Sequence, residues 1–113
     1  MARKNTLTST PPYAVEQALN RLGTNLRTAR LRRNLTIEDV AEKIGTGRRA
    51  VMDAEKGKGS TSSAVYIALL WAYDLLDQIR DMADPALDEE GLNLSLSKER
   101  ARGRVQEGLD NDF

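Results

Sequence analysis

The chain has 113 residues, and its 17 basic and 17 acidic residues give a formal net charge of zero at neutral pH. This length allows one small domain with tails, and the absence of both cysteine and histidine excludes disulfide bonds, thiol nucleophiles and histidine-based acid–base chemistry. No apolar run approaches the roughly 20 residues of a membrane span, and residues 1–12 are too polar for a secretory signal peptide, so we expect a cytoplasmic protein.

The charge is unevenly distributed along the chain. Residues 1–60 contain twelve Lys and Arg against six Asp and Glu, a balance of +6, whereas residues 61–113 contain five against eleven, a balance of −6. A basic half attracts nucleic acid phosphates, and an acidic half keeps other surfaces away from the duplex. We therefore favour nucleic acid binding over the alternative that these charges merely solvate surface helices.

Residues 1–12, which are rich in Thr, Ser and Pro, predict a flexible N-terminal arm. From Val15 to Ala29, apolar residues recur at spacings of four, three, four and three, which predicts one long amphipathic helix. The prolines at positions 11 and 12 start this helix, and Arg32 and Arg33 lie near its end, where the helix dipole favours cations.

Two short helices with a tight connection are predicted between residues 36 and 57. Thr36 is a good N-cap for the first helix, and Asp39 three residues later makes an acidic variant of the capping box. Its apolar stripe consists of Val40, Ala41 and Ile44. Gly45 suits the left-handed residue that closes such a helix.

The second short helix is capped by Thr46 or Gly47, begins with the adjacent arginines Arg48 and Arg49, and ends at Gly57. A helix this short can enter the major groove of DNA, where two guanidinium groups at its start can reach base edges or phosphates. The sequence therefore indicates DNA binding ahead of any catalytic chemistry.

Six residues of this stretch follow a known pattern, which in chain order is Thr36, Ala41, Gly45, Val51, Glu55 and Gly57. The stretch closely resembles the helix-turn-helix of the lambda-type repressors, the Xre family. The resemblance extends over roughly residues 13–83 and implies an all-α, five-helix, lambda-repressor-like DNA-binding domain. The chain departs from the family at Ile37, where Gln often contacts a phosphate, and at Gly47, where Ser or Thr commonly begins the second helix.

The predicted base-contacting residues are Gly47, Arg48, Arg49 and Asp53. Arg48 and Arg49 are the main candidates, with guanine O6 and N7 as their targets. Asp53 occupies a place where the resembled family often contacts a base, and two roles are open for it. It could accept a hydrogen bond from cytosine N4, or it could hold an arginine in position through an ion pair.

The predicted phosphate-contacting residues are Arg33, Thr36, Ile37 through its amide, Lys56, Lys58 and Ser60. For the last three, a solvated linker is an alternative of nearly equal weight. The resemblance further implies a structural ion pair between Arg30 and Glu55, whose partial burial would make either truncation costly.

Ser62 is expected to cap a fourth helix over residues 64–73, followed by Asp74 in a left-handed turn. A fifth helix is expected from Leu75 to just before Pro85. The apolar residues of this region exceed what one side of a small core needs. We therefore assign four of them partly to a dimer interface, with plain core as the alternative: Trp71, Leu75, Ile79 and Met82.

Residues 84–113 are expected to form a C-terminal tail that contacts a partner or a second subunit. Its first part is acidic and turn-like. Leu92, Leu94 and Leu96 then alternate with polar residues, which predicts a short strand that pairs with the same strand of a second subunit or with the edge of another protein. For residues 98–113 an unstructured tail is favoured.

Taken together, the sequence predicts a homodimeric transcriptional repressor that binds a palindromic operator in double-stranded DNA, without cofactor, metal or enzymatic activity. The run from Tyr66 to Ile79 and the charged tail also resemble HipB-type antitoxins, which repress their own operon and bind a HipA-type serine/threonine kinase toxin. Two alternatives stay open. One is a stand-alone prophage or metabolic repressor, and the other is a protein-binding adaptor that does not use DNA.

Overall fold

Every regular element among the described residues is helical, which confirms the all-α, lambda-repressor-like fold class. The structure, a computed structural model, describes the backbone of residues 6–111 and the side chains of residues 6–105. The chain divides into two compact units, the first ending at Asp77 and the second beginning at Gln78. No helix in the part that the structure describes is long and apolar enough to cross a membrane.

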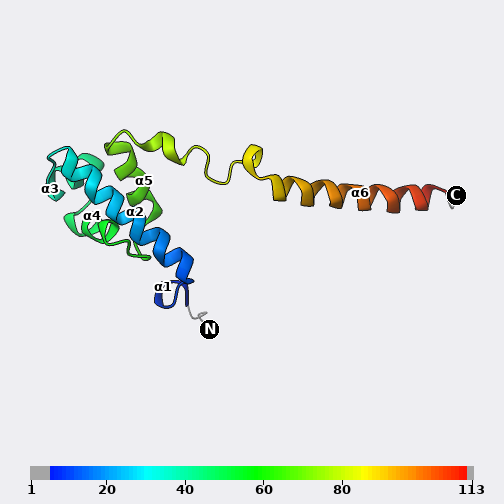
Figure 1. Ribbon diagram of the computed structural model, residues 1–113, viewed down its shortest axis with the longest axis horizontal. Coiled ribbons are helices and arrows are strands. Elements are labelled where there is room, and N and C mark those ends of the chain that lie inside the picture. Colours follow the sequence, from blue (N-terminus) through cyan, green and yellow to red (C-terminus); the bar gives the residue numbers. More distant parts are fainter. Residues whose placement is uncertain (1–5, 112–113) are drawn as a thin grey trace. The chain divides into compact units, whose positions relative to one another are not determined.

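The first unit is built around four helices, which Figure 1 shows in blue to green. They are α2 (Tyr13–Arg32), α3 (Ile37–Ile44), α4 (Arg48–Glu55) and α5 (Ser63–Ala72). Helix α4 packs against α2, α3 and α5, and α3 also packs against α5. The largest fully buried side chains come from every one of these helices and from the residue after α5: Leu26, Val40, Val51, Leu69 and Tyr73.

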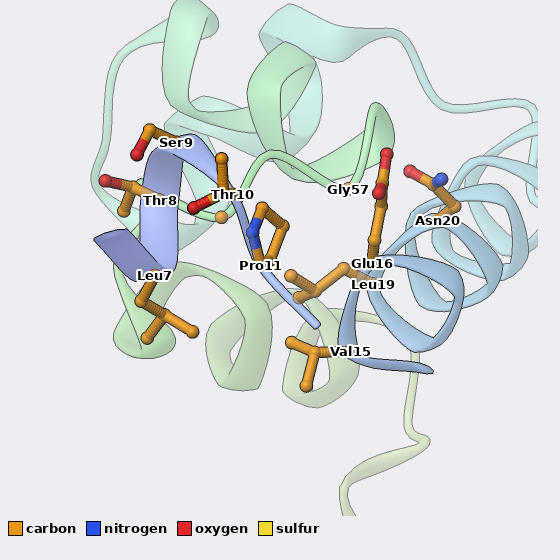
Figure 2. Close-up of a pocket in the computed structure, with 11 residues that line it drawn as sticks. Leu7, Thr8, Ser9, Thr10, Pro11, Val15, Glu16, Leu19, Asn20 and Gly57 are labelled. Atoms are coloured by element: carbon orange, nitrogen blue, oxygen red, sulfur yellow. The ribbon is translucent and has the colours of Figure 1, made fainter. Parts of the chain in front are cut away.

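The N-terminal segment differs from the expected arm over its described part. Residues Thr6–Ser9 form a one-turn helix, α1, before α2 begins directly after Pro12. A hollow of about 390 Å³ lies between α1, the first turns of α2 and the loop after α4, with Leu7, Leu19 and Gly57 among its lining residues (Figure 2). Residues 1–5, with the two expected cations Arg3 and Lys4, lie outside the described residues.

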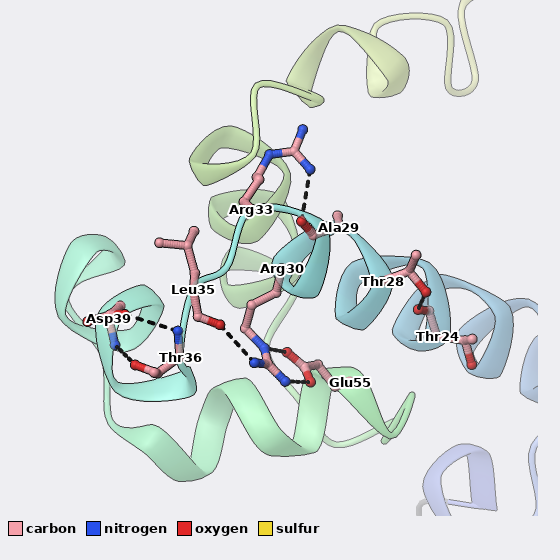
Figure 3. Close-up of polar contacts among 9 residues, drawn as sticks. All are labelled: Thr24, Thr28, Ala29, Arg30, Arg33, Leu35, Thr36, Asp39 and Glu55. Atoms are coloured by element: carbon pink, nitrogen blue, oxygen red, sulfur yellow. Dashed lines mark hydrogen bonds and ion pairs between the residues drawn. The ribbon is translucent and has the colours of Figure 1, made fainter.

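The capping signals around α3 form as predicted. The Thr36 hydroxyl accepts a hydrogen bond from the Asp39 amide at 3.0 Å, and the Asp39 carboxylate accepts one from the Thr36 amide at 3.0 Å (Figure 3). The hydrogen bond from the Thr36 backbone holds the pKa of Asp39 below its ordinary value. Gly45 closes α3 in the left-handed conformation, with φ at 78°.

Helices α2 and α4 approach each other closely because two glycines face the opposing backbone. A Cβ added at Gly23 would lie 2.6 Å from the Glu55 carbonyl oxygen and 2.7 Å from the Gly57 nitrogen. Gly57 follows α4 with φ at +70°, and a Cβ there would lie 2.5 Å from the Leu19 carbonyl oxygen. The C-terminal end of α4 is therefore seated on the middle of α2.

Helix α5 is capped by Ser62, whose hydroxyl accepts from the Ala64 amide at 3.1 Å, and Asp74 adopts the expected left-handed turn with φ at 57°. The expected fifth helix over residues 75–83 is wrong. Only a short 3-10 helix, η1 (Leu76–Ile79), forms there. The segment is interrupted at both of its ends. The left-handed Asp74 ends α5, and Pro85 disfavours a helical conformation at Asp84, which is extended. Ala83 is also left-handed, with φ at 57°, and a left-handed residue does not continue an α-helix.

The second unit contains a 3-10 helix, η2 (Pro85–Leu87), and the long helix α6 (Glu89–Asn111). The strand expected over residues 92–96 is wrong, and so is the unstructured tail expected for 98–111, since both lie within α6. Asp88 accepts a hydrogen bond from the Gly91 amide at 2.9 Å at the start of this helix. Leucine also has a higher helix propensity than the β-branched residues typical of strands.

The change from strand to helix redistributes the three leucines of this segment. Leu92 and Leu96 share one face because they are four residues apart, whereas Leu94 lies on nearly the opposite face. All three side chains are exposed. They therefore do not form the single apolar edge that the alternating pattern suggested.

The close approach of α2 and α4 yields a stability prediction. Replacing Gly23 with Ala should lower the free energy of unfolding by about 2 kcal/mol or more, because the new methyl group collides with backbone atoms that cannot rotate away. Urea unfolding measures this change. Gly103→Ala is the matched control, since a Cβ there meets nothing within 4 Å. Equal stability of the two variants would contradict the packing described here.

Candidate functional site

The connection between α3 and α4 places the start of α4 at the surface. Three residues link the helices, and the Thr46 amide donates to the Ala41 carbonyl oxygen at 2.9 Å. Gly47, the N-cap of α4, is extended and exposed, and a Cβ there would meet no atom within 4 Å. No side chain caps α4, so the first-turn amides are left for other partners.

Arg48 and Arg49 occupy the first two positions of α4 and project into solvent. The Arg48 side chain is 63% exposed, and its Nη1 lies 3.2 Å from Oε1 of Glu38, in the first turn of α3. The Arg49 side chain is 79% exposed, and its Nε lies 3.4 Å from Oδ1 of Asp53. Exposed ion pairs of this kind contribute only about 0–1 kcal/mol, so both guanidinium groups can exchange these partners for others.

Asp53 lies between two cations of the same surface. Its side chain is 19% exposed, and its second carboxylate oxygen lies 3.8 Å from the Lys58 Nζ. Of the two roles considered for Asp53, the ion pair with an arginine is present in the structure. The carboxylate thus links the base-contacting and phosphate-contacting candidates.

The remaining phosphate candidates are spread over the start of α3 and the loop after α4. The Thr36 hydroxyl is occupied by the capping box, and Ile37 is the first residue of α3. Lys56, Lys58 and Ser60 are exposed. The loop that carries Lys58 is attached to α5, because the Tyr66 hydroxyl donates a hydrogen bond to the Lys58 carbonyl oxygen at 3.0 Å.

Arg33, which was predicted to contact a phosphate, makes structural contacts within the first unit. Its Nη1 donates to the Ala29 carbonyl oxygen at 2.9 Å, and its Nη2 donates to the Tyr73 carbonyl oxygen at 2.8 Å. Its guanidinium carbon also lies 5.5 Å from the centre of the Tyr73 ring. These contacts tie the end of α2 to the end of α5, and the phosphate contact of Arg33 stays a prediction.

The ion pair implied by the resemblance is present. Arg30 Nε lies 2.7 Å from Glu55 Oε2, and Nη2 lies 3.0 Å from Oε1, while Nη1 donates to the Leu35 carbonyl oxygen at 3.0 Å (Figure 3). Both side chains are at least nine-tenths buried. Hydrogen bonding to the Glu55 carboxylate raises the pKa of Arg30 above its ordinary value. The pair joins the end of α2 to the last residue of α4.

The four apolar residues considered for a dimer interface fall into both units. Trp71, on α5, is 53% exposed and lies beneath Lys43, whose Nζ is 5.7 Å from the centre of the indole ring. Leu75 is partly buried in the same unit. Ile79 and Met82 belong to the second unit, where Met82 is exposed. The dimer role of these four residues therefore stays a prediction.

Two residues of the site were not predicted from the sequence. Glu38 had no predicted role, although it lies in the helix before the tight connection that leads to Arg48. Tyr66 was assigned only to an apolar helix, although a buried tyrosine needs a hydrogen-bond acceptor, and the neighbouring loop supplies one. Among the described residues, no cluster of three or more acidic, histidine or cysteine side chains could hold a metal ion.

Comparison with protein-family models gives a match to the helix-turn-helix domain over residues 21–82, more than half of the chain. The matched residues include α3 and α4 and the pair Arg30–Glu55. No curated protein and no solved structure gives a match in the corresponding comparisons.

The buried ion pair yields a second stability prediction. Glu55→Gln should lower the free energy of unfolding by about 3 kcal/mol, because it leaves the Arg30 guanidinium buried without a counter-charge. Glu38→Gln, which removes the exposed partner of Arg48, should cost less than about 1 kcal/mol. Denaturant unfolding of both variants tests this contrast, and a Glu55→Gln variant as stable as the control would refute it.

Tyr73 yields a pH prediction, because its buried hydroxyl has no hydrogen-bond partner among the described residues and burial raises its pKa to about 12. An unfolded tyrosine titrates near pH ~10. Between these two values the unfolded state holds fewer protons, so the free energy of unfolding falls as the pH rises. Tyr73→Phe should be as stable as the wild type at pH 7, or more so, and should lack this part of the alkaline loss. Parallel alkaline curves for the two proteins in urea unfolding would show that the hydroxyl is not shielded.

Proposed function

Because the chain belongs to the helix-turn-helix domain family, we propose that it is a sequence-specific transcriptional repressor that binds operator DNA as a homodimer. The family assignment makes it a DNA-binding transcription regulator. The family assignment does not include the repressor role, the palindromic operator or the homodimer. These three parts of the proposal are supported by the charges and the exposed side chains of the first unit.

The exposed arginine pair at the start of α4 carries this proposal. A helix of eight residues fits the major groove end-on, with its first turn nearest the base edges. Arg48 and Arg49 sit in that turn, and each is oriented by one carboxylate, Glu38 or Asp53. This arrangement lowers the entropy cost of fixing each guanidinium on guanine O6 and N7. Asp53 thereby acts mainly by positioning Arg49.

Phosphates on either side of the groove would be contacted from the two ends of the helix pair. The free amides at the start of α3, at Ile37, face one phosphate, as helix N-termini commonly do. Lys56, Lys58 and Ser60 follow α4 and would contact another. Two subunits would occupy half-sites about 34 Å apart on one face of the duplex.

Dimerisation is supported by the exposed apolar side chains of α5. Ile67 and Trp71, one turn apart, are 43% and 53% exposed. Neighbouring apolar side chains left in water on a small domain favour association. A dimer would also supply the symmetry that a palindromic operator requires.

Within this class, we propose an antitoxin of the HipB type that represses the operon of a HipA-type kinase. The proposal is supported by the resemblance of residues 66–79 and by the exposed side chains of Leu92 and Leu96 on α6. The acidic residues Asp74, Asp77 and Asp81 would share one face only in a continuous helix over residues 74–81. No such helix forms, so the side of α6 that carries Leu92 and Leu96 is the better candidate surface for this partner.

Experiments can distinguish the antitoxin role from two alternatives, a stand-alone repressor and a protein-binding adaptor. A kinase-like reading frame adjoining the gene, whose product is retained by the purified protein, favours the antitoxin over a stand-alone repressor. A protein-binding adaptor would show no affinity for DNA that falls steeply with salt, whereas a repressor releases counterions from several phosphates.

The base-contacting role of Arg49 gives a direct test. DNA that the wild type selects from a random pool serves as the probe in competition binding. Arg49→Ala should weaken binding by about 1–3 kcal/mol and relax the preference at one base position. Arg21→Ala, which removes the same charge from an exposed position of α2, is the matched control. Undiminished discrimination against scrambled DNA by Arg49→Ala would refute the assignment.

A further inference from the structure

Helix α6 is acidic at its start and predominantly basic at its middle, where Glu99 is the one acidic residue of the stretch 98–104. Asp88, Glu89 and Glu90 lie at its start, and four cations follow at its middle: Lys98, Arg100, Arg102 and Arg104. Glu90 and Arg104 are fourteen residues apart, which corresponds to about 21 Å along a helix. These two blocks therefore cannot neutralise each other within one helix, and none of the four cations forms an ion pair among the described residues.

The same helix has a coiled-coil seam on one side. Gly91, Leu94, Lys98, Ala101 and Val105 recur at spacings of three and four, the heptad pattern of a helix that packs along another. Leu94 is 65% exposed and Val105 is 64% exposed. A shallow hollow of about 370 Å³ follows the seam and is lined by Lys98, Ala101, Arg102 and Val105.

No described side chain of α6 is buried. A helix gains most of its stability from packing one apolar side against another element, and an isolated helix is marginal even when it is long. Apolar side chains repeated along one side of an exposed helix therefore require a partner, and the charge blocks identify which one.

We propose that α6 pairs antiparallel with α6 of a second copy of this chain. With the two-fold axis near residues 95–97, Glu90 of one copy lies opposite Arg104 of the other, and Asp88 lies opposite Arg102. The symmetry repeats both pairs, so each acidic block meets a basic block. A parallel pair would instead place each block beside the same block of its partner, where like charges repel.

Four of the five seam residues pair within α6 in this register, whereas Val105 lies opposite Leu87, before the start of the helix. Gly91 of one copy lies opposite Ala101 of the other, and these small residues let the helices approach closely. Leu94 lies opposite the aliphatic stem of Lys98, whose ammonium group can reach the edge of the interface. Both the charged pairs and the seam thus select the same antiparallel alignment.

This inference does not depend on DNA binding, because it concerns the association of the second unit alone. Its test is the oligomeric state of the full-length protein, measured by sedimentation equilibrium, with circular dichroism as the check on folding. The wild type should be dimeric. Glu90→Arg alone and Arg104→Glu alone should each weaken self-association at least tenfold, because each makes two like-charge contacts in the homodimer.

Mixing the two single variants tests whether the lost contacts are the antiparallel ones. A Glu90→Arg chain and an Arg104→Glu chain complement each other at both symmetric contacts, so the mixture should recover association as a heterodimer. The double variant should again form a homodimer. Arg100→Glu reverses a charge on the same helix away from the seam and should leave association unchanged.

Three results would overturn the proposal. The first is a monomeric wild type, and the second is a pair of single variants that dimerise as tightly as Arg100→Glu. The third is a mixture of the two single variants that fails to recover association. In that case the weaker association of each single variant would have a cause other than the antiparallel contacts. Single variants that stay dimeric would remove only the α6 contact and leave the homodimer of the proposed function in place, whereas a monomeric wild type would contradict both. Operator binding by the Arg100→Glu protein is measured separately, because DNA binding does not depend on the α6 contact.

Discussion

The buried pair Arg30–Glu55 is the contact on which the geometry of this protein depends. It attaches the last residue of α4 to the end of α2, and the glycines at 23 and 57 allow the two backbones to meet just beside it. Since one end of α4 is fixed in this way, its other end is directed outward. A buried pair contributes little net stability compared with apolar packing, but removing one partner is expensive. Its value here lies in setting the orientation of the helix.

At the outward end of α4, two arginine side chains are exposed to solvent and are also oriented by neighbouring carboxylates. Arg48 and Arg49 are open to solvent, yet each lies near one carboxylate, and both carboxylates belong to the helix pair itself. Such contacts are weak in water, so they orient the guanidinium groups without holding them away from DNA. Arg33, which is just as basic in the sequence, is instead bound to two carbonyl oxygens. Charge alone therefore does not identify an interface residue, and its local partners do.

Most features set by local chemistry could be predicted from the sequence, whereas the one distant contact that was predicted, the pair Arg30–Glu55, came from the family resemblance. The capping box at Thr36, the left-handed Gly45 and Asp74, and the cap at Ser62 each depend on residues within a few positions, and all are present. The pairing of Glu38 with Arg48 and the use of Arg33 depend on how helices cross, which spacing does not reveal. The predicted strand was wrong because an alternation of Leu with Ser and Asn is compatible with a helix as well. The Asp88 cap and the helix propensity of leucine favour the helix.

The central claim is that the two arginines of α4 enter the major groove, and methylation interference tests it most directly. Guanines in operator DNA selected by the wild type are methylated at N7, which lies in that groove. Methylation of guanines in two half-sites about 34 Å apart should block binding. That block should disappear when Arg48 and Arg49 are both replaced by Ala. Binding that is indifferent to N7 methylation, or a pattern of interference that the double replacement leaves intact, would contradict the account.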